Sequence, residues 1–211
     1  GMALETAYVR IPEAWNRPDK TWLAAFADFP VANICDAMER LNMCDAGIVP
    51  VTAHTAFVGF AIPVLVTPGD NAAVIRSLDY IQPGDVMMIN GQGHIDRALV
   101  GEQLTQRFQH AGAVAQVIDG AVRDRKVIES TGLPTFCRGV SPAGPFKNGP
   151  GVIGEPVAIG GVVCAAGDIV VGDDDGIIVI PFWRAEAVLA EVREVARREA
   201  EMTAEVTRQY K

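Results

Sequence analysis

The chain has 211 residues and a formal net charge of −8, with 49% hydrophobic and 21% charged residues, a balance typical of a folded globular protein and not of a disordered one. One hydrophobic core is enough at this length, so we expect residues 1–211 to form a single domain. An acidic chain without a basic cluster is repelled by nucleic acids and anionic membranes, so we expect neither as a partner.

The first third of the chain is predicted to be helical. Apolar residues recur at helical spacing over Glu13–Ala27, within an N-terminal helical extension that we place at residues 1–30. A second helix is predicted to follow Asn33, whose side chain can cap it, and to run to Leu41.

The middle of the chain alternates strands with helices, which is typical of an α/β fold. The side chain of Asp70 can cap the first of these helices. In chain order we expect a strand at 55–66 ending in a turn, a helix at 70–81, a strand at 84–90, a glycine-rich loop at 90–94, a helix from about Gly101 to Ala111, and a strand at 113–118 that ends in a turn at Gly120.

The last third begins with short β segments and ends in a long helix. Several apolar runs separated by glycine turns lie within residues 155–181, and the acidic sequence at 172–176 is predicted to be a hairpin turn and not a calcium loop. Residues 182–211 are rich in Ala, Glu and Arg with apolar residues on one side, which predicts an amphipathic helix.

Several common chemistries lack their motifs. The four cysteines are scattered without a C-x-x-C pair, so neither a thiolate zinc site nor a dithiol redox motif is encoded. The sequence contains no H-E-x-x-H, no G-x-S-x-G and no G-x-G-x-x-G opening a helix after a strand. No secretory signal and no run of about 20 apolar residues is present, so we expect a cytoplasmic protein.

The polar residues around Gly101 and Arg123 form the main candidate site. The amides of Glu102, Gln103 and Leu104 are among the first donors of a helix, have no acceptor within it, and suit a small anion such as a carboxylate. Helix, strand and turn return the chain to the same edge of the sheet, where the planar fork of Arg123 suits a carboxylate or 2-oxo acid. Asp124 adds an oxygen ligand for a hard divalent cation.

The segments "GEQL" and "VIDGAVRD", with twenty residues between Glu102 and Arg123, resemble the Asp-x20-Arg-Asp signature of the RraA-like family. The resemblance is greatest to the class II pyruvate aldolases that cleave 4-hydroxy-4-methyl-2-oxoglutarate and decarboxylate oxaloacetate. Here Glu102 stands where those enzymes have aspartate. Asp124 is retained, whereas the family's regulators of ribonuclease E lack an acid at this position.

The resemblance implies an α/β fold of the three-layer β/β/α type known from swivelling domains. It also implies Mg²⁺, Mn²⁺ or another divalent metal held directly by Asp124, with Arg123 and Glu102 as catalytic residues and with substrate contacts from residues 101–104 and Arg123. Glu102 and a neighbouring subunit's Glu199 are implied as water-mediated metal contacts. The assembly implied is a homotrimer or homohexamer with helix 182–211 at the subunit interface.

Two other functions remain open from the sequence. A non-catalytic regulator of this family would bind a ribonuclease or another protein and would turn over no 2-oxo acid. A Schiff-base aldolase would use Lys126 or Lys147 as the nucleophile and would need no metal.

Overall fold

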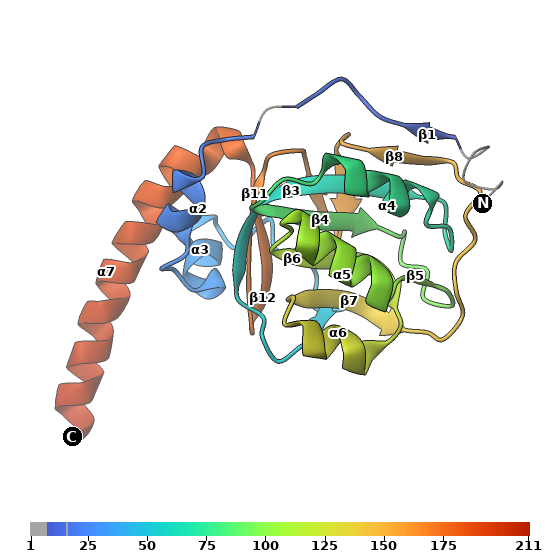
Figure 1. Ribbon diagram of the computed structural model, residues 1–211. Helices are drawn as coiled ribbons and strands as arrows, with labels where there is room; N and C mark the ends of the chain where they lie inside the picture. The colour runs from blue at the N-terminus through green and yellow to red at the C-terminus, as the bar shows by residue number, and fades with distance from the viewer. Residues whose placement is uncertain (1–7, 16) are drawn as a thin grey trace.

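The computed structural model describes residues 8–15 and 17–211. Its centre is a mixed sheet with the strand order β1-β8-β3-β4-β6-β7-β2, in which β5 pairs with β6 and the β11–β12 hairpin continues from β3 (Figure 1). The strands of this sheet are β1 (Val9–Arg10), β2 (Val49–Pro50), β3 (Phe57–Val66), β4 (Asp85–Asn90), β5 (Ala98–Val100), β6 (Ala115–Val122), β7 (Thr135–Val140), β8 (Gly151–Ile153), β11 (Ile169–Asp173) and β12 (Gly176–Ile180).

One face of the parallel strands is covered by helices. Strands β3, β4, β6 and β7 pair in parallel, and the helices that connect them lie on the same face (Figure 1). Apolar side chains of these strands pack against Val74, Phe108 and Ile128 of the three helices. The connecting elements are α4 (Ala72–Arg76), the short 3₁₀ helix η1 (Ser77–Tyr80), α5 (Glu102–Ala111) and α6 (Arg125–Thr131).

The other face of the sheet is covered by a second β-layer. The antiparallel strands β9 (Val157–Ile159) and β10 (Val162–Cys164) pack there together with the β11–β12 hairpin. Met88 and Val117 of the central sheet are buried in one apolar cluster with Ile159 and Val179 of the second layer. The predicted α/β fold with three β/β/α layers is confirmed.

A third cluster joins the remaining helices to the β11–β12 hairpin. These helices are α2 (Thr21–Phe26), α3 (Val31–Ala37) and α7 (Ala185–Tyr210), and the 3₁₀ turn η2 (Phe182–Arg184) leads into α7. The expected C-terminal amphipathic helix is thus present, and its far half projects beyond the rest of the molecule (Figure 1). Met202, Val206 and Tyr210 on this half are 65%, 53% and 77% exposed. Within residues 8–15 and 17–211, none of the helices combines the length and apolarity that crossing a membrane requires.

The helix expected over Glu13–Ala27 is wrong in its first half, because α2 covers Thr21–Phe26 alone. Residues 13–15 and 17–20 are not helical, and residues 1–7 and 16 of the predicted extension lie outside the described residues. Arg17 anchors this part of the chain, with its Nη2 2.7 Å from Oδ2 of the fully buried Asp85. The guanidinium of Arg17 also stacks 5.3 Å from the ring centre of Trp15. A buried carboxylate needs a charged partner, and this pairing overrides the helical spacing of the apolar residues.

The expectation that Asn33 caps the second helix is also wrong. The helix covers Val31–Ala37, so the buried Asn33 lies inside it and the helix ends before Leu41. The amide of Val31 donates instead to Oδ2 of Asp173, at 2.9 Å, from the β11–β12 hairpin.

Asp70 makes the expected type of contact, one residue before the capping position. Its Oδ1 accepts the amide of Ala72 at 2.9 Å, although Asn71 occupies the N-cap position of α4. Its Oδ2 accepts the amides of Asn148 and Gly149 at 2.6 and 3.0 Å. Asp70 therefore ties the start of α4 to the loop that precedes β8.

The strand expected at 113–118 is longer than the sequence suggested, because β6 continues through Gly120 to Val122. Gly120 is therefore not a turn. A Cβ atom at this position would lie 3.3 Å from the carbonyl oxygen of His94, so glycine allows the loop after β4 to approach the strand. The chain turns at Arg123 and Asp124 instead and enters α6, a helix that the sequence analysis did not identify. The hairpin expected at 172–176 is confirmed, with Asp173 paired to Gly176.

Candidate active site

Arg123 and Asp124 lie directly after β6, at the carboxyl-terminal edge of the parallel strands. Asp124 is the N-cap residue of α6 and adopts φ 58° and ψ 40°. This left-handed conformation favours glycine, and aspartate is one of the few other residue types that adopt it. Asp124 is the only one of the described non-glycine residues with positive φ that lines the cavity described below; Glu39, Arg40, Asn42 and Gln92 share this backbone region elsewhere.

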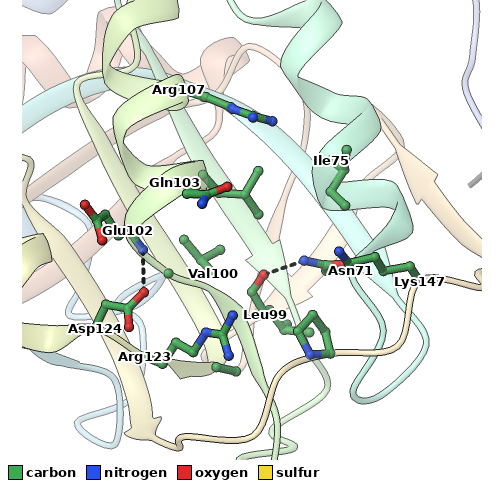
Figure 2. Close-up of a pocket in the computed structure, with 14 residues that line it drawn as sticks. Asn71, Ile75, Leu99, Val100, Glu102, Gln103, Arg107, Arg123, Asp124 and Lys147 are labelled. Carbon is green, nitrogen blue, oxygen red and sulfur yellow. Dashed lines mark hydrogen bonds between the residues drawn. The ribbon is translucent and has the colours of Figure 1, made fainter. Parts of the chain in front are cut away.

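The start of α5 meets Asp124 from the neighbouring element. The backbone amide of Glu102 donates a hydrogen bond to Oδ2 of Asp124 at 3.0 Å (Figure 2). Gly101, the N-cap residue of α5, has extended backbone angles that any residue can adopt. A glycine is required here because there is no room for a side chain. A Cβ atom at Gly101 would lie 2.7 Å from Oδ2 of Asp124.

Arg123 is placed beside these groups with its charged end available. Its backbone amide donates to the carbonyl of Val100 at 3.0 Å, and its guanidinium lies against Gly144, where a Cβ atom would be 3.3 Å from Nη1. The side chain is exposed and makes no ion pair with any residue of the described chain. Its fork of N–H donors is therefore free to bind a carboxylate bidentately.

These residues line a cavity of about 350 Å³ between α5, β5 and the loop before β8 (Figure 2). Gly101, Glu102, Gln103 and Leu104 all line it, as expected for the candidate substrate-binding residues. Its charged side chains are three cations and two acids: Arg107, Arg123 and Lys147 with Glu102 and Asp124. The excess of positive charge suits an anionic ligand.

A divalent cation fits this site only if it keeps most of its water ligands. Within the described residues, no group of three or more His, Cys, Asp or Glu side chains converges as a metal cage. One carboxylate, Asp124, lies in the cavity wall with the acid Glu102 beside it. Mg²⁺ is commonly held by one or two carboxylates plus waters and substrate oxygens, so the donor set fits such an ion.

Two acidic residues expected near the metal are placed differently from Asp124. The carboxylate of Glu102 points away from Arg123 in Figure 2, and the backbone amide of Glu102, not its side chain, contacts Asp124. Glu199 is exposed on α7, which projects from the molecule on the side opposite β5 (Figure 1). A single chain therefore does not bring Glu199 to the cavity.

The sequence analysis did not place Asn71 or Arg107 in the site, and it considered Lys147 only as a Schiff-base nucleophile. All three line the cavity. Asn71 follows the turn after β3, and the carboxyl ends of parallel strands share one edge, where ligands bind in open α/β sheets. The expected order of strand, turn and helix over 55–81 places residue 71 near this edge, but no sequence feature indicated that its side chain lines the cavity.

Comparison with known proteins identifies similar chains. A family model described as RraA-like, aldolase/RraA, matches residues 31–179. A protein of Halalkalibacterium halodurans named putative 4-hydroxy-4-methyl-2-oxoglutarate aldolase is 36% identical over 172 residues, which cover 82% of each chain. A protein of Aromatoleum aromaticum with the same name is 32% identical over 156 residues, covering 72% of this chain and 96% of that one.

Among solved structures, Streptomyces coelicolor RraAS2 is similar in fold and sequence. It superposes with a TM-score of 0.77 at 26% identity, covering 92% of this chain and 99% of that one. RraAS2 is described as an unusual member of the RNase ES inhibitor RraA protein family. The similar proteins thus include both proteins named as aldolases and a relative of ribonuclease inhibitors.

Proposed function

The chain belongs to the RraA-like family, and from this premise we propose that it is a divalent-metal-dependent lyase that forms pyruvate. Its substrates would be a 4-hydroxy-2-oxo acid such as 4-hydroxy-4-methyl-2-oxoglutarate, cleaved at a C–C bond, or oxaloacetate, decarboxylated. The observation that carries the proposal is the junction of Asp124, the amide of Glu102 and the free guanidinium of Arg123 at one cavity wall.

The pyruvyl half of the substrate would bind at this junction. The amides at the start of α5 and the guanidinium of Arg123 are donors that suit its carboxylate and 2-oxo oxygen. A divalent cation bound at Asp124 would supply Lewis-acid stabilisation of the charge that develops on the 2-oxo oxygen. The backbone amide of Glu102 orients the carboxylate of Asp124, which would hold this ion.

Both reactions break a bond to C3 and leave the same product. In aldol cleavage the C3–C4 electron pair stays on C3, the C4 hydroxyl loses its proton, and C4 becomes a carbonyl carbon. In decarboxylation the same electron pair stays on C3 and CO₂ leaves. Each route forms the pyruvate enolate, and the guanidinium of Arg123 would donate hydrogen bonds to its developing negative charge. Glu102 and a water are the candidate bases for the hydroxyl proton.

The assembly we propose is a trimer or hexamer. The exposed apolar residues of α7, namely Met202, Val206 and Tyr210, support a subunit contact there. In such an assembly Glu199 of a neighbouring subunit would approach the metal.

The test measures pyruvate release, coupled to lactate dehydrogenase, from both keto acids with Mg²⁺ and with EDTA. Release should require metal and exceed the metal-only background. Arg123→Ala should lower it by roughly 10²-fold or more, the cost of removing a donor to a developing oxyanion. Arg125→Ala, on the next helix and outside the cavity wall, is the matched control and should behave as the parent.

Other outcomes would point elsewhere. Pyruvate release that resists EDTA, together with a covalent substrate adduct trapped by borohydride, would indicate a lysine nucleophile. Lys147 is the candidate in the cavity wall. No release from either compound would favour a regulator that binds a ribonuclease or another protein, a function supported by the similarity to RraAS2.

A further inference from the structure

The guanidinium of Arg123 lies against a backbone surface that another segment provides. A Cβ atom on Gly144 would lie 3.3, 3.8 and 3.9 Å from Nη1, Cζ and Nη2 of Arg123, so the planar group rests on the main chain at that residue. Pro145 and Lys147, which follow Gly144, line the same cavity as Arg123. The position of the guanidinium therefore depends on where residues 143–147 lie.

Arg97, directly before β5, contacts this segment with its side chain. Its Nη1 donates a hydrogen bond to the carbonyl oxygen of Gly144 at 2.8 Å. Its Cζ lies 4.0 Å from the ring centre of Phe146, a distance at which a cation and an aromatic face attract each other. One side chain thus holds the segment on both sides of Pro145.

Further contacts fix Arg97 itself. The amide of Ala98, the next residue, donates to the carbonyl oxygen of Ala143 at 2.8 Å. The stem of Arg97 packs against the turn after β3, where a Cβ atom on Gly69 would lie 3.2 Å from Cδ of Arg97. The amide of Phe146 donates to the carbonyl oxygen of Gly69 at 2.9 Å. Arg97 therefore lies between two anchored pieces of chain, which leave its side chain little freedom to move.

We propose that Arg97 is a positioning residue for Arg123 and acts through the backbone of Gly144. This inference rests on the proposed lyase function, in which the guanidinium of Arg123 binds the pyruvyl half of the substrate. Arg97 is not part of the cavity wall, so its effect must pass through the residues that it holds. A displaced guanidinium keeps its charge but loses its alignment with a carboxylate, and small displacements of this kind are costly to catalysis.

The test is a double-mutant cycle between Arg97 and Arg123, with Mg²⁺ present. Arg97→Met keeps an unbranched stem for the contact with Phe146 and removes the donor to Gly144. It should lower kcat/KM for pyruvate release from 4-hydroxy-4-methyl-2-oxoglutarate by about 10-fold, because the guanidinium of Arg123 is displaced but not removed. In the Arg123→Ala background the same change should lower kcat/KM by less than about twofold, since the side chain that Arg97 positions is absent.

Two further variants address the same contact. Arg97→Lys retains a cationic donor and should recover part of the loss seen in Arg97→Met. Gly144→Ala disturbs the contact from the opposite side, because its methyl group would crowd Nη1 of Arg123. Gly144 is outside the left-handed backbone region, so alanine adds bulk there without backbone strain. This variant should also lower kcat/KM only where Arg123 is present.

Binding of pyruvate separates this inference from the proposed function, because it needs no turnover. Isothermal titration calorimetry with Mg²⁺ measures the dissociation constant of pyruvate, which Arg97→Met should raise by about 10-fold in the parent and leave nearly unchanged in Arg123→Ala. Arg184→Met is the matched control, since it removes an arginine that lies 6.0 Å from the ring centre of Trp183, outside the cavity wall. It should bind and turn over as the parent does. The unfolding temperature of each variant is measured alongside.

Each outcome has one meaning. An equal fall in both backgrounds would overturn the inference, because Arg97 would then act through Lys147, which lies apart from Arg123 in Figure 2, or through the stability of the segment. Parental kcat/KM in both Arg97→Met and Gly144→Ala would overturn it as well. A parent that shows the coupling in pyruvate binding but releases no pyruvate would contradict the lyase function and support the positioning role. A parent that neither binds nor releases pyruvate would contradict both.

Discussion

A Cβ atom on Gly101 would lie 2.7 Å from Oδ2 of Asp124, so the carboxylate reaches the first turn of α5 because residue 101 has no side chain. This approach also positions the hydrogen bond from the amide of Glu102. The contact joins two elements that are far apart in sequence, and it explains why a glycine without a left-handed backbone occupies the N-cap position.

We predict that Gly101→Ala lowers pyruvate release by about 10²-fold, because displacing a reacting group by about 1 Å can have an effect of this size. The change should leave the fold intact, since the methyl group displaces a side chain at the cavity wall and not a core residue. Pyruvate release and circular dichroism, measured on the same preparation, check both parts. Parental activity would mean that the position of Asp124 is not critical.

Two substitutions of Asp124 can distinguish the energetic cost of its left-handed backbone from the role of its carboxylate. With φ at 58°, glycine is more favourable than alanine at this position. We predict that Asp124→Gly and Asp124→Ala both abolish metal-dependent pyruvate release, while the glycine variant has the higher free energy of unfolding by about 1 kcal/mol. Urea denaturation of the two variants measures this difference. Equal stability would indicate that the turn relaxes when the carboxylate is removed.

Local sequence features placed one half of the candidate cavity. The segment from Gly101 to Leu104 and the pair Arg123–Asp124 are local features, a helix start and a turn, and the structure brings them together at one cavity wall. The other half depends on contacts between distant segments. Asn71 lines the cavity because the turn after β3 and the loop before β8 meet there, and its spacing in the sequence carries no sign of this meeting.

The errors in the fold have a similar origin. Helical spacing over Glu13–Ala27 predicted a helix, but the ion pair of Arg17 with the buried Asp85 holds the first part of that segment in another conformation. The glycine at 120 resembled a turn, whereas it serves a close approach by the loop after β4. In both cases a tertiary contact determines the local structure, and a pattern of neighbouring residues contains no information about it.

Three buried cysteines, Cys44, Cys137 and Cys164, should make the protein less stable in alkali, because burial raises the pKa of each thiol. Burial raises the pKa of Cys44 to about 12, with further contributions from Asp119 and Asp45. Burial also raises the pKa of Cys137, to about 11. All three thiols stay protonated in the folded protein at a pH where an exposed thiol, with a pKa near 9.0, has ionised.

The unfolded state therefore binds fewer protons above pH 9, and the stability that these thiols contribute is lost as the pH rises toward their folded pKa values. We predict that the free energy of unfolding falls between pH 9 and pH 11 by up to about 1.4 kcal/mol per pH unit for each thiol. Urea denaturation across this range measures the slope. The double variant Cys44→Ala, Cys137→Ala should show a shallower slope, and an unchanged slope would assign the effect to other groups.

Glu199 provides the test of a site shared between subunits. It is exposed on the projecting half of α7, on the same half as the apolar residues Met202 and Val206. If this half packs on a neighbouring subunit, the carboxylate of Glu199 can complete a site whose Asp124 belongs to another chain. Glu199→Ala should then lower both turnover and the affinity for Mg²⁺.

The same arrangement predicts complementation between two impaired variants. Asp124→Ala subunits lack the metal-binding carboxylate but still supply Glu199, and Glu199→Ala subunits supply the reverse. After subunit exchange by mild denaturation and refolding of a mixture, some sites contain both wild-type residues, so pyruvate release should exceed that of either variant treated alone. Glu205→Ala, exposed further along the same helix, is the control and should keep parental turnover. A mixture no more active than its components would place Glu199 outside the neighbouring site, and parental turnover in Glu199→Ala would remove it from the chemistry altogether.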